Sequence, residues 1–512
     1  MSSFPFAAGI VPHSLPVPPV RSPPAAISHS RGPSIEELDS IKLADHGSLA
    51  RKEYDGDSGS IEMPTTPKCA KQAFDVQTPT TPGELEASQP PTPKRGTATS
   101  ALPSYRYPRM NRWRVLCACL IYFGNGMSDS AAGALIPYIE DFYHIGYAVV
   151  SMIWIANAVG YISSAFVTEW VLTRCGRART LMIAEAFMIG AYVVVTCAPP
   201  FPVVVVAFFF MGFGNATNLA LNNVFCANLA DSTVILGAAH GSYGVGGIVA
   251  PIAATAMVSN GVFWARFYLV TIGIRILCFF FAGWSFWSYE SEPTSNFNSD
   301  LQQLADKQAD EQEGQSSKME LLKKALKNKT TLIGALFIFA YQGAEVAESG
   351  WFISYLINYR HGDPAKVGYV TSGFWAGITI GRFTLTHLAH RVGERRFVFA
   401  TSVGVIIFQL LSWLIPNIIG NAVSVAVLGL LLGPVYPAAA TVFTKLLPRR
   451  LQTIAIGFIS SAGSSGGAVV PFLTGLIAQG SGTWVLHPVC IGAYVGMLIC
   501  WAVLPRVKKP TS

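Results

Sequence analysis

Long apolar segments constrain this sequence more than any other feature. A helix needs about 20 residues to cross the roughly 30 Å hydrocarbon core of a bilayer. Twelve such runs cover residues 113–139, 147–172, 180–198, 201–229, 233–258, 262–288, 330–357, 366–388, 397–415, 419–446, 451–478 and 484–504. Strands of a transmembrane barrel would instead alternate over about ten residues. The sequence therefore predicts an all-α integral membrane protein with twelve transmembrane helices.

Composition separates a polar leader from this apolar body. Of the 512 residues, 51% are hydrophobic and only 13% are charged, whereas soluble proteins average roughly 25% charged. The first 100 residues hold 15 of the 32 prolines, and the chain starts without the basic segment of a cleavable signal peptide. We expect a disordered cytosolic leader over 1–108, six-helix bundles over 109–288 and 330–505, a cytosolic central loop over 289–329 and a cytosolic tail over 506–512.

The basic residues indicate the orientation of the body. With the N-terminus in the cytosol, the inner loops receive 22 Lys and Arg residues and the outer loops receive three. An excess of positive charge on the cytosolic side is the rule for membrane proteins, so we expect both termini in the cytosol, with the plasma membrane as the default location. The net charge of +7 is then a topological signal, and no basic stripe with interleaved aromatics points to nucleic acid.

Neither a cofactor nor an enzymatic activity is indicated. The nine cysteines form no CxxC motif and no cluster with histidine, so we expect packing thiols and no metal site. The sequence also lacks a P-loop, which argues against an ATP-driven pump. The lipid bilayer, a small-molecule solute and protons are the expected partners.

The second half of the body repeats the first. Shifting it back by 217 positions aligns, without a gap, the identical pairs Ile121/Ile338, Gly126/Gly343, Gly133/Gly350, Ile136/Ile353, Tyr138/Tyr355, Gly160/Gly377, Phe166/Phe383, Arg174/Arg391, Gly176/Gly393 and Arg179/Arg396. A shift of 220 aligns Gly246, Gly247 and Pro251 with Gly466, Gly467 and Pro471. Such self-similarity indicates two homologous halves.

Parallel six-helix repeats joined by a charged loop resemble the major facilitator superfamily, which implies a solute site between the halves near the midplane. The loop Thr173-Arg174-Cys175-Gly176-Arg177 is similar to that family's Asp-Arg-x-Gly-Arg signature, and His390-Arg391-Val392-Gly393-Glu394 resembles its second copy. Thr173 and His390 replace the usual Asp. The resemblance implies gating roles for Arg174, Gly176, Arg177, Arg391 and Gly393.

Within that superfamily the body is similar to the fucose and glucose permease group. The stretches that carry this resemblance are Tyr341–Val346 with Gly350-Trp351, Ile380–Phe383, and His240–Gly246 with Pro251. Acidic residues that proton-coupled fucose permeases carry on the first and fourth spans fall here at Gly133 and Thr217. The solute therefore does not transfer from the group.

Ionisable side chains inside the spans are the candidate coupling groups. Each costs roughly 2.5–3.5 kcal/mol at mid-membrane and normally faces a cavity or a partner. They are Asp129, His240, Arg275, Glu345, Glu348 and Arg382. Six such groups imply a wet pathway through the body.

Tyr341, Glu345 and Glu348 recur at i, i+4 and i+7, on one helix face, with Gln342 beside them. A partly desolvated carboxylate there could exchange a proton during transport. We predict Glu345 as the leading proton or substrate group and Asp129 as the second. The alternative is a static ion pair with Arg275 or Arg382.

Amides and aromatic rings are the candidate solute ligands. Asn215, Asn218 and Asn222 share one face of the fourth span, and neutral amides suit a hydroxylated solute, although hydrogen bonds between helices would equally explain them. Candidate stacking residues are Tyr243, Trp351, Trp375 and Tyr436, for which the alternative is packing. Tyr341 and Gln342 complete the predicted solute-binding set.

These features favour secondary active transport by alternating access, as a symporter or an antiporter. A proton-coupled importer of a sugar-like solute is the first hypothesis, and efflux of a small metabolite or toxin by proton antiport is the second. A third is a nutrient receptor on a transporter scaffold. Thr66-Pro67, Thr78-Pro79, Thr81-Pro82 and Thr92-Pro93 resemble sites of a proline-directed kinase, a further candidate partner.

Overall fold

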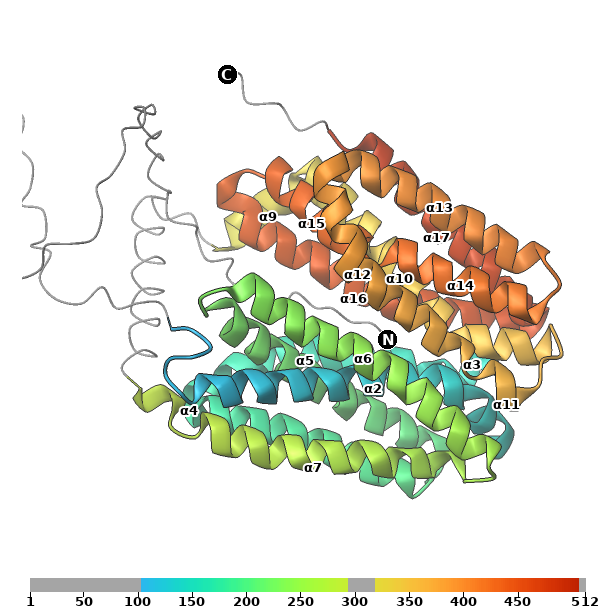
Figure 1. Cartoon of the computed structure of the whole chain (residues 1–512), viewed down its shortest axis with the longest axis horizontal. Coiled ribbons are helices and arrows are strands. Elements are labelled where there is room, and N and C mark those ends of the chain that lie inside the picture. The colour runs from blue at the N-terminus through green and yellow to red at the C-terminus, as the bar shows by residue number, and fades with distance from the viewer. Residues whose placement is uncertain (1–102, 293–317, 506–512) are drawn as a thin grey trace, which may run out of the picture. The chain divides into compact units, whose positions relative to one another are not determined.

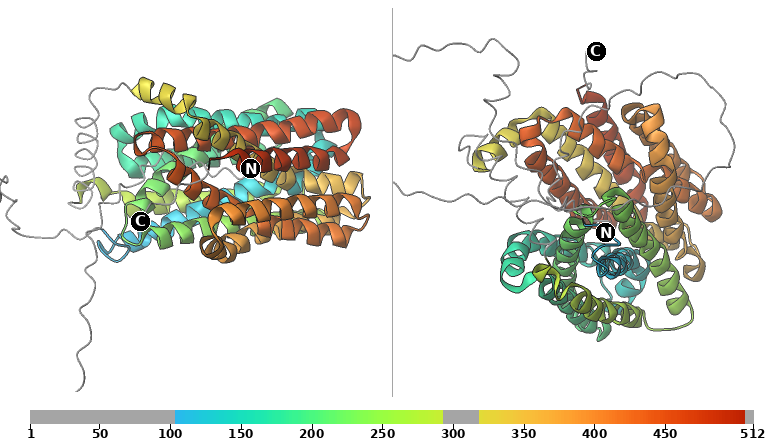
Figure 2. Two further views of the ribbon diagram at one scale, coloured as in Figure 1. Left: turned by 90° about the horizontal axis from the view of Figure 1, so that it is seen from above. Right: turned by 60° about the vertical axis from the view of Figure 1, so that its left-hand side comes forward.

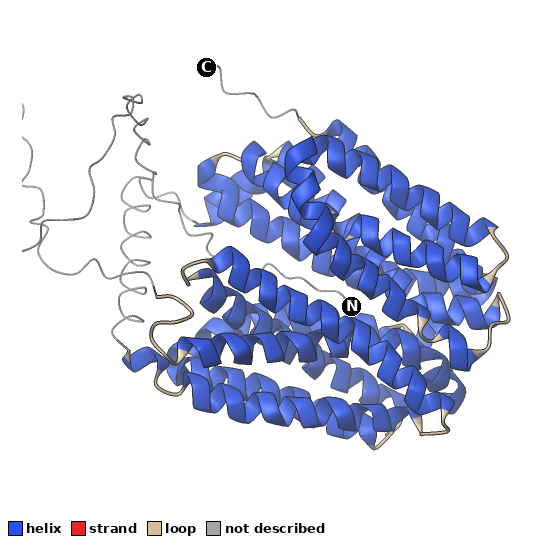
Figure 3. Cartoon of the chain, viewed as in Figure 1, coloured by secondary structure: helices blue, strands red, loops and turns tan. Residues whose placement is uncertain are grey.

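The computed structural model describes residues 103–292 and 318–505, which form helices joined by short loops with no strand among them (Figures 1 and 3). The leader up to residue 102, with its Thr-Pro sites, lies outside the described residues, as do residues 293–317 of the central loop and the tail. The structural description that follows therefore concerns the two helical halves.

The first half runs from blue to green in Figure 1. Its helices are α2 (Asn111–Tyr143), α3 (Tyr147–Val150), α4 (Met152–Thr196), α5 (Phe201–Ala227), α6 (Ser232–Ser259) and α7 (Phe267–Phe286), with 3-10 turns η1 (Trp264–Arg266) and η2 (Tyr289–Ser291).

The second half runs from yellow to red and lies beside the first (Figure 1 and the right view of Figure 2). Its helices are α9 (Lys318–Lys327), α10 (Lys329–Asn358), α11 (Pro364–Val367), α12 (Val370–Val392), α13 (Glu394–Leu414), α14 (Ile418–Leu432), α15 (Val435–Leu446), α16 (Arg449–Ser481) and α17 (Leu486–Val503), with the turn η3 (Thr483–Val485).

All twelve predicted spans fall on helices. Nine helical segments in the described ranges are long and apolar enough to cross a membrane, and one of them, Tyr147–Thr196, contains two predicted spans. Helices α2 and α12 supply the remaining two. Both helices interrupt their apolar residues with polar ones, such as Asp129 in α2 and Arg382 in α12, and therefore fall short of a purely compositional test.

Local backbone chemistry explains two departures from the predicted spans. The second and third spans merge into α4, with a bend at Gly176, whose φ of 77° favours a residue without a side chain. The span predicted as continuous over 419–446 is instead two helices, α14 and α15. Pro434 lies between them and has no amide hydrogen to continue the helical bonding.

The two halves pack their helices in the same way. A Cβ atom on Gly126 of α2 would collide with the carbonyl oxygen of Tyr243 in α6. In the second half, a Cβ on Gly466 of α16 would collide with the carbonyl oxygen of Phe339 in α10. Small residues permit such close backbone approach inside membranes. Because Gly126 aligns with Gly343 of α10 and Gly246 with Gly466, the duplicated glycines lie on equivalent helix pairs.

Contacts between the halves, which we call the seam, run mainly between α6 and α12, between α2 and α10, and between α16 and both α3 and α4, with smaller contacts of α6 with α11 and of α2 with α12. A Cβ on Gly244 would collide with the Thr379 side chain, and one on Gly133 with the backbone of Ser349. The seam is therefore built on direct backbone approach as well as on side chains.

The two ends of the body differ in the contacts that hold their helices together. At the end that we call the basic end, Arg114 donates to both carboxylate oxygens of Glu292, at 2.6 and 2.8 Å, and Lys445 lies 2.9 Å from Glu394. At the opposite end, the Ala148 amide donates to Oε1 of Gln479 at 3.3 Å across the seam. Contacts at the opposite end thus join the two halves directly.

Candidate functional site

Asp129 lies in the middle of α2 and is 3% exposed. The Asn215 amide of α5 donates to its Oδ1 at 3.0 Å, and the Tyr243 hydroxyl of α6 donates to its Oδ2 at 2.6 Å. Hydrogen bonds to a carboxylate are among the strong ones in proteins. Asp129 therefore joins three helices of the first half through its two oxygens.

The hydrogen-bonded group around Asp129 continues across the seam. The Tyr243 ring meets the ring of Trp375 in α12 edge-on, with centroids 6.2 Å apart, and Trp375 Nε1 donates to Ser349 Oγ in α10 at 3.0 Å. Gly247 of α6 leaves room for the indole, because a Cβ there would lie 3.1 Å from it. Asp129, Tyr243, Trp375 and Ser349, which we call the crossing, thus connect the halves at mid-helix.

Glu345 lies on the same helix as Ser349 and is 1% exposed. Its Oε1 is 3.5 Å from an Arg382 guanidinium nitrogen, and the arginine side chain keeps 17% of its surface exposed. The sequence left open whether Glu345 is a coupling group or half of an ion pair. The geometry gives it a cationic partner that is not fully sealed from the surroundings.

The remaining polar and aromatic candidates of the seam lie around this pair. Tyr341 packs its ring 5.9 Å from that of Tyr436, and its hydroxyl is 3.4 Å from the Leu432 carbonyl oxygen. The half-buried His240 of α6 meets Tyr122 edge-on, with ring centroids 5.1 Å apart. These side chains therefore come from both halves, His240 and Tyr122 from the first and Tyr341 and Tyr436 from the second.

The three asparagines of α5 do not act as one unit. Asn215 reaches Asp129, whereas Asn218 donates to Oε1 of Glu185 at 2.8 Å and Asn222 donates to the Asn218 carbonyl oxygen at 2.9 Å. All three are buried. Of the predicted amide face, Asn215 alone among the three bonds to a crossing residue, and the other two bond to protein groups within the first half.

Glu185 is a buried carboxylate that the sequence analysis missed. It lies in α4, is fully buried, and its Oε1 is 3.4 Å from a guanidinium nitrogen of Arg275 in α7. Its position inside the predicted span 180–198 was the signal that could have found it. Arg275 is therefore paired within the first half, not with Glu345.

Glu348 faces the interior of the second bundle. Gln409 Nε2 of α13 donates to Glu348 Oε2 at 3.2 Å and lies 2.8 Å from Nδ1 of His487 in α17. Sequence reasoning missed Gln409 and His487, although His487 falls inside the predicted span 484–504. The shared face expected for Tyr341, Glu345 and Glu348 thus divides, because Glu348 bonds to α13 and Glu345 pairs with α12.

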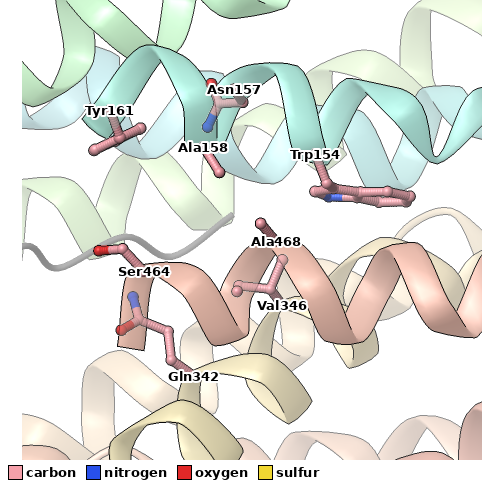
Figure 4. A pocket seen from close by; sticks show the side chains of 9 residues that line it. Trp154, Asn157, Ala158, Tyr161, Gln342, Val346, Ser464 and Ala468 are labelled. Carbon is pink, nitrogen blue, oxygen red and sulfur yellow. The ribbon is translucent and has the colours of Figure 1, made fainter. Parts of the chain in front are cut away.

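A pocket opens between α4 of the first half and α10 and α16 of the second (Figure 4). Its cavity volume is about 20 Å³, which is room for about one water molecule. Its lining residues are Trp154, Asn157, Ala158, Tyr161, Gln342, Val346, Ser464, Gly467 and Ala468. In Figure 4 the α4 side chains Asn157 and Tyr161 face Ser464 and Gln342 across the seam.

Trp351 closes one side of this region. Its ring lies 5.2 Å from that of Trp154, and its Nε1 donates to the Pro471 carbonyl oxygen at 2.8 Å. Of the pocket residues, only Gln342 was among the predicted site residues. Trp154 and Asn157 belong to a span that has no charged candidate, so no sequence signal pointed to them.

The signature loops lie at the basic end. The Arg177 backbone amide donates to Glu290 at 2.5 Å and its guanidinium donates to the Leu221 carbonyl oxygen at 2.7 Å, while Arg174 covers the Trp170 ring at 4.1 Å. Gly393 has a φ of 96° and separates α12 from α13, and Arg391 is exposed. Glu290, which follows the sixth span, was not predicted as a partner of this loop.

Within residues 103–292 and 318–505, no three His, Cys, Asp or Glu side chains are arranged to hold a metal ion. The described cysteines are free thiols. The chemistry of the candidate site thus comes from carboxylates, an arginine, amides and aromatic rings.

A family model described as Major Facilitator Superfamily matches residues 118–361 and, a second time, residues 349–512. The protein Bypass of stop codon protein 6 of Saccharomyces cerevisiae is 27% identical over 77% of this chain and 82% of its own length. The glucose/mannose transporter GlcP of Bacillus subtilis is 22% identical over 77% of this chain and 93% of its own.

Two solved structures share the fold. A point mutant of the nucleoside transporter NupG superposes with a TM-score of 0.60 at 12% identity, covering 76% of this chain and 99% of NupG. A bacterial homologue of the human lysosomal transporter Spinster, in an inward-facing and unoccupied conformation, gives a TM-score of 0.60 at 13% identity over 77% of this chain and 96% of its own.

Proposed function

Because the chain belongs to the major facilitator superfamily, we propose that it carries a small, hydroxylated, sugar-like solute across a membrane by alternating access, coupled to protons. Membership confirms the resemblance that the duplication and the signature loops indicated, together with the twelve-helix fold. It makes the chain a transporter of a small solute and not an enzyme.

The crossing is the observation that carries the proposal. Solute sites of such carriers lie between the two halves near the midplane, and here Asp129 and Tyr243 of the first half meet Trp375 and Ser349 of the second. A solute that inserts between Tyr243 and Trp375 would contact both halves at once. Rocking of the halves would then change its surroundings from one side to the other.

The chemistry around the crossing supports a neutral, hydroxylated solute. The Asn215 amide, the Tyr243 hydroxyl and the Ser349 hydroxyl offer donors and acceptors beside an indole ring, a combination that suits a sugar. The similarity to a glucose/mannose transporter over 77% of the chain supports the same class. Aromatic rings at Trp154 and Trp351 would equally hold an apolar ring, which favours efflux of a metabolite as the second candidate.

Two carboxylates at the seam support proton coupling. Glu345 pairs with Arg382, and Asp129 is held by neutral donors. Protonation of Glu345 would remove its attraction to Arg382 and free helices α10 and α12 to shift. We further propose that the basic end faces the cytosol, following the excess of Lys and Arg on that side, and that the membrane is the plasma membrane.

Uptake by the full chain in sealed vesicles tests the proposal. With an imposed pH gradient, radiolabelled D-glucose and D-mannose should accumulate, and E345Q should abolish the dependence on the gradient. E320Q, which removes an exposed carboxylate from a Glu320–Lys324 pair, is the matched control and should transport like the natural chain. The proposal of coupling fails if E345Q stays fully dependent on the pH gradient.

The direction of transport separates the candidates. An importer accumulates the sugar in vesicles when the gradient directs protons inward together with it, whereas an antiporter expels solute against inward protons. A receptor on a transporter scaffold would bind a sugar and accumulate none in either gradient. The first outcome supports the proposal, and either of the others overturns it.

A further inference from the structure

A buried polar cluster lies inside the second bundle, off the seam. Glu348 of α10 is 1% exposed, and Gln409 of α13 and His487 of α17 are 0% exposed. These three residues, which we call the wall cluster, come from three different helices. The central pocket does not include them.

One amide nitrogen holds the wall cluster together. Gln409 Nε2 lies 3.2 Å from Glu348 Oε2 and 2.8 Å from His487 Nδ1. A primary amide nitrogen has two hydrogens, so one is donated to the carboxylate and the other to the imidazole. His487 then accepts at Nδ1 and carries its own hydrogen on Nε2. Gln409 is therefore a positioning residue that fixes both titratable groups.

Three other polar atoms of the wall cluster lack hydrogen bonds within the described ranges. Within the described part of the chain, Glu348 Oε1, Gln409 Oε1 and His487 Nε2 have no hydrogen-bond partner. Each buried unsatisfied group costs about 1–3 kcal/mol, so an apolar core would be more stable here. Stability alone does not account for a carboxylate and an imidazole joined in this way.

Titratable or aromatic side chains surround the wall cluster on each helix that carries one of its members. Helix α17 contributes Cys490, whose thiol contacts Glu348, and Tyr494, which interacts electrostatically with both Glu345 and Glu348. On α10 itself the Tyr355 ring meets the His487 ring at 4.4 Å. Helix α13 contributes Gln409 and the Trp413 ring, which stacks on His487 at 6.1 Å. The surroundings are thus polar on one side of His487.

The side chain of Arg360 links the surroundings of His487 to the opposite end of the body. Arg360 follows α10, keeps part of its surface exposed, and donates to the Tyr355 hydroxyl at 2.7 Å. Tyr355 in turn contacts His487. The order Arg360, Tyr355, His487, Glu348 therefore leads from the end of the body into its interior without entering the seam.

We propose that the wall cluster is a proton-binding site that exchanges with solution at the opposite end and is separate from Glu345. In the unprotonated form of the site, Glu348 is a carboxylate and His487 is neutral. One proton from water converts Glu348 to the neutral acid, and the net charge of the cluster changes from −1 to zero. The same proton returns to water when the site empties.

The wall cluster would act together with the proposed proton coupling at Glu345. Its role in transport therefore rests on the proposed function. Glu348 lies three residues after Glu345 on α10, and Tyr494 interacts with both. Because residues three positions apart on a helix are neighbours, a proton on Glu348 would weaken the repulsion between the two carboxylates. The charge state of the wall cluster would set how readily Glu345 ionises beside Arg382.

The test measures proton binding without any solute. The purified full-length chain, in lipid nanodiscs, is titrated with acid while infrared difference spectra follow the carbonyl stretch of protonated carboxyl groups. E348Q should remove one titrating band, and E345Q should remove a different one. H487N and Q409L should keep the Glu348 band and shift its midpoint by about one pH unit, equivalent to a tenfold change in proton affinity.

Two outcomes overturn the proposal: a spectrum of E348Q identical to that of the natural chain, or a Glu348 midpoint that neither H487N nor Q409L moves. E348D keeps the acid and displaces its band, which assigns that band even if E348Q does not fold. Because no sugar is present, failure of glucose or mannose uptake would sink the proposed function and leave this result standing. Sugar uptake that succeeds together with an unchanged E348Q spectrum would refute the proton site at the wall cluster and leave the proposed function standing.

Discussion

The buried pair Glu185–Arg275 offers the sharpest quantitative test of the fold. Both side chains are 0% exposed and their charged atoms are 3.4 Å apart. With an effective dielectric constant of about 20, Coulomb's law gives an attraction of about 5 kcal/mol at that distance. Loss of one partner leaves the other charge buried and alone, which typically costs about 3–5 kcal/mol.

Three variants separate this pairing from simple packing. R275M keeps most of the side-chain volume, and E185Q keeps an oxygen that accepts from Asn218. We expect each single change to lower the free energy of unfolding by about 3 kcal/mol. The double variant has neither charge. Its free energy of unfolding should fall by at least about 2 kcal/mol less than the sum of the two single losses, because the two side chains are coupled.

The assay is denaturant unfolding of the purified chain in detergent, followed by tryptophan fluorescence. The control pair Glu320–Lys324 is about half exposed on both sides, and K324M should change stability by less than about 0.5 kcal/mol. Additive losses in R275M and E185Q would show that the two charges do not interact. The assignment of Arg275 to a static pair would then be wrong.

Three further experiments test the seam and the leader. An ideal Cβ on Gly368 lies 2.9 Å from the Cβ of Thr255, slightly closer than the roughly 3.5–4.5 Å between the Cβ atoms of a disulfide. The double variant T255C/G368C should therefore cross-link under oxidation, and the cross-link should block vesicle uptake until it is reduced. Full uptake by the cross-linked chain would contradict alternating access at this end. W375F removes the bond to Ser349 and should raise the KM for the transported sugar several-fold, measured by initial uptake rates, with expression unchanged. Deleting residues 1–100 should change the uptake rate if phosphates on the Thr-Pro sites regulate transport, and an unchanged rate would argue against that role.

Most of the fold could be predicted because the bilayer imposes length and polarity on every span. Every predicted apolar run falls on a helix, and the repeated glycines Gly126/Gly343 and Gly246/Gly466 lie where helices of the same half approach closely. The break at Pro434 was missed because the residues around it are apolar throughout. A hydropathy pattern registers the apolar character of a helix but not its interruption.

Less of the site could be predicted, because pairings depend on contacts between distant segments. Glu185 and Arg275 are 90 positions apart, and Gln409 and His487 are 78 apart. Helical periodicity places residues on a face of their own helix and does not say which neighbour that face meets. Glu345 and Glu348 shared a predicted stripe, yet they bond to different helices, because the stripe is wide enough to border two neighbours.

The buried carboxylates differ in what each can contribute to transport. Glu185 has an arginine and an amide as partners and lies within one half, so rocking of the halves leaves its surroundings unchanged. Asp129 and Glu345 lie at the seam, where their partners belong to helices that contact the other half. A group can couple proton binding to solute movement only if its surroundings differ between the two states, because a ligand shifts an equilibrium only by its differential affinity for them. That requirement favours Glu345 and Asp129 over Glu185, and it predicts that D129N weakens the dependence of uptake on the pH gradient whereas E185Q keeps it.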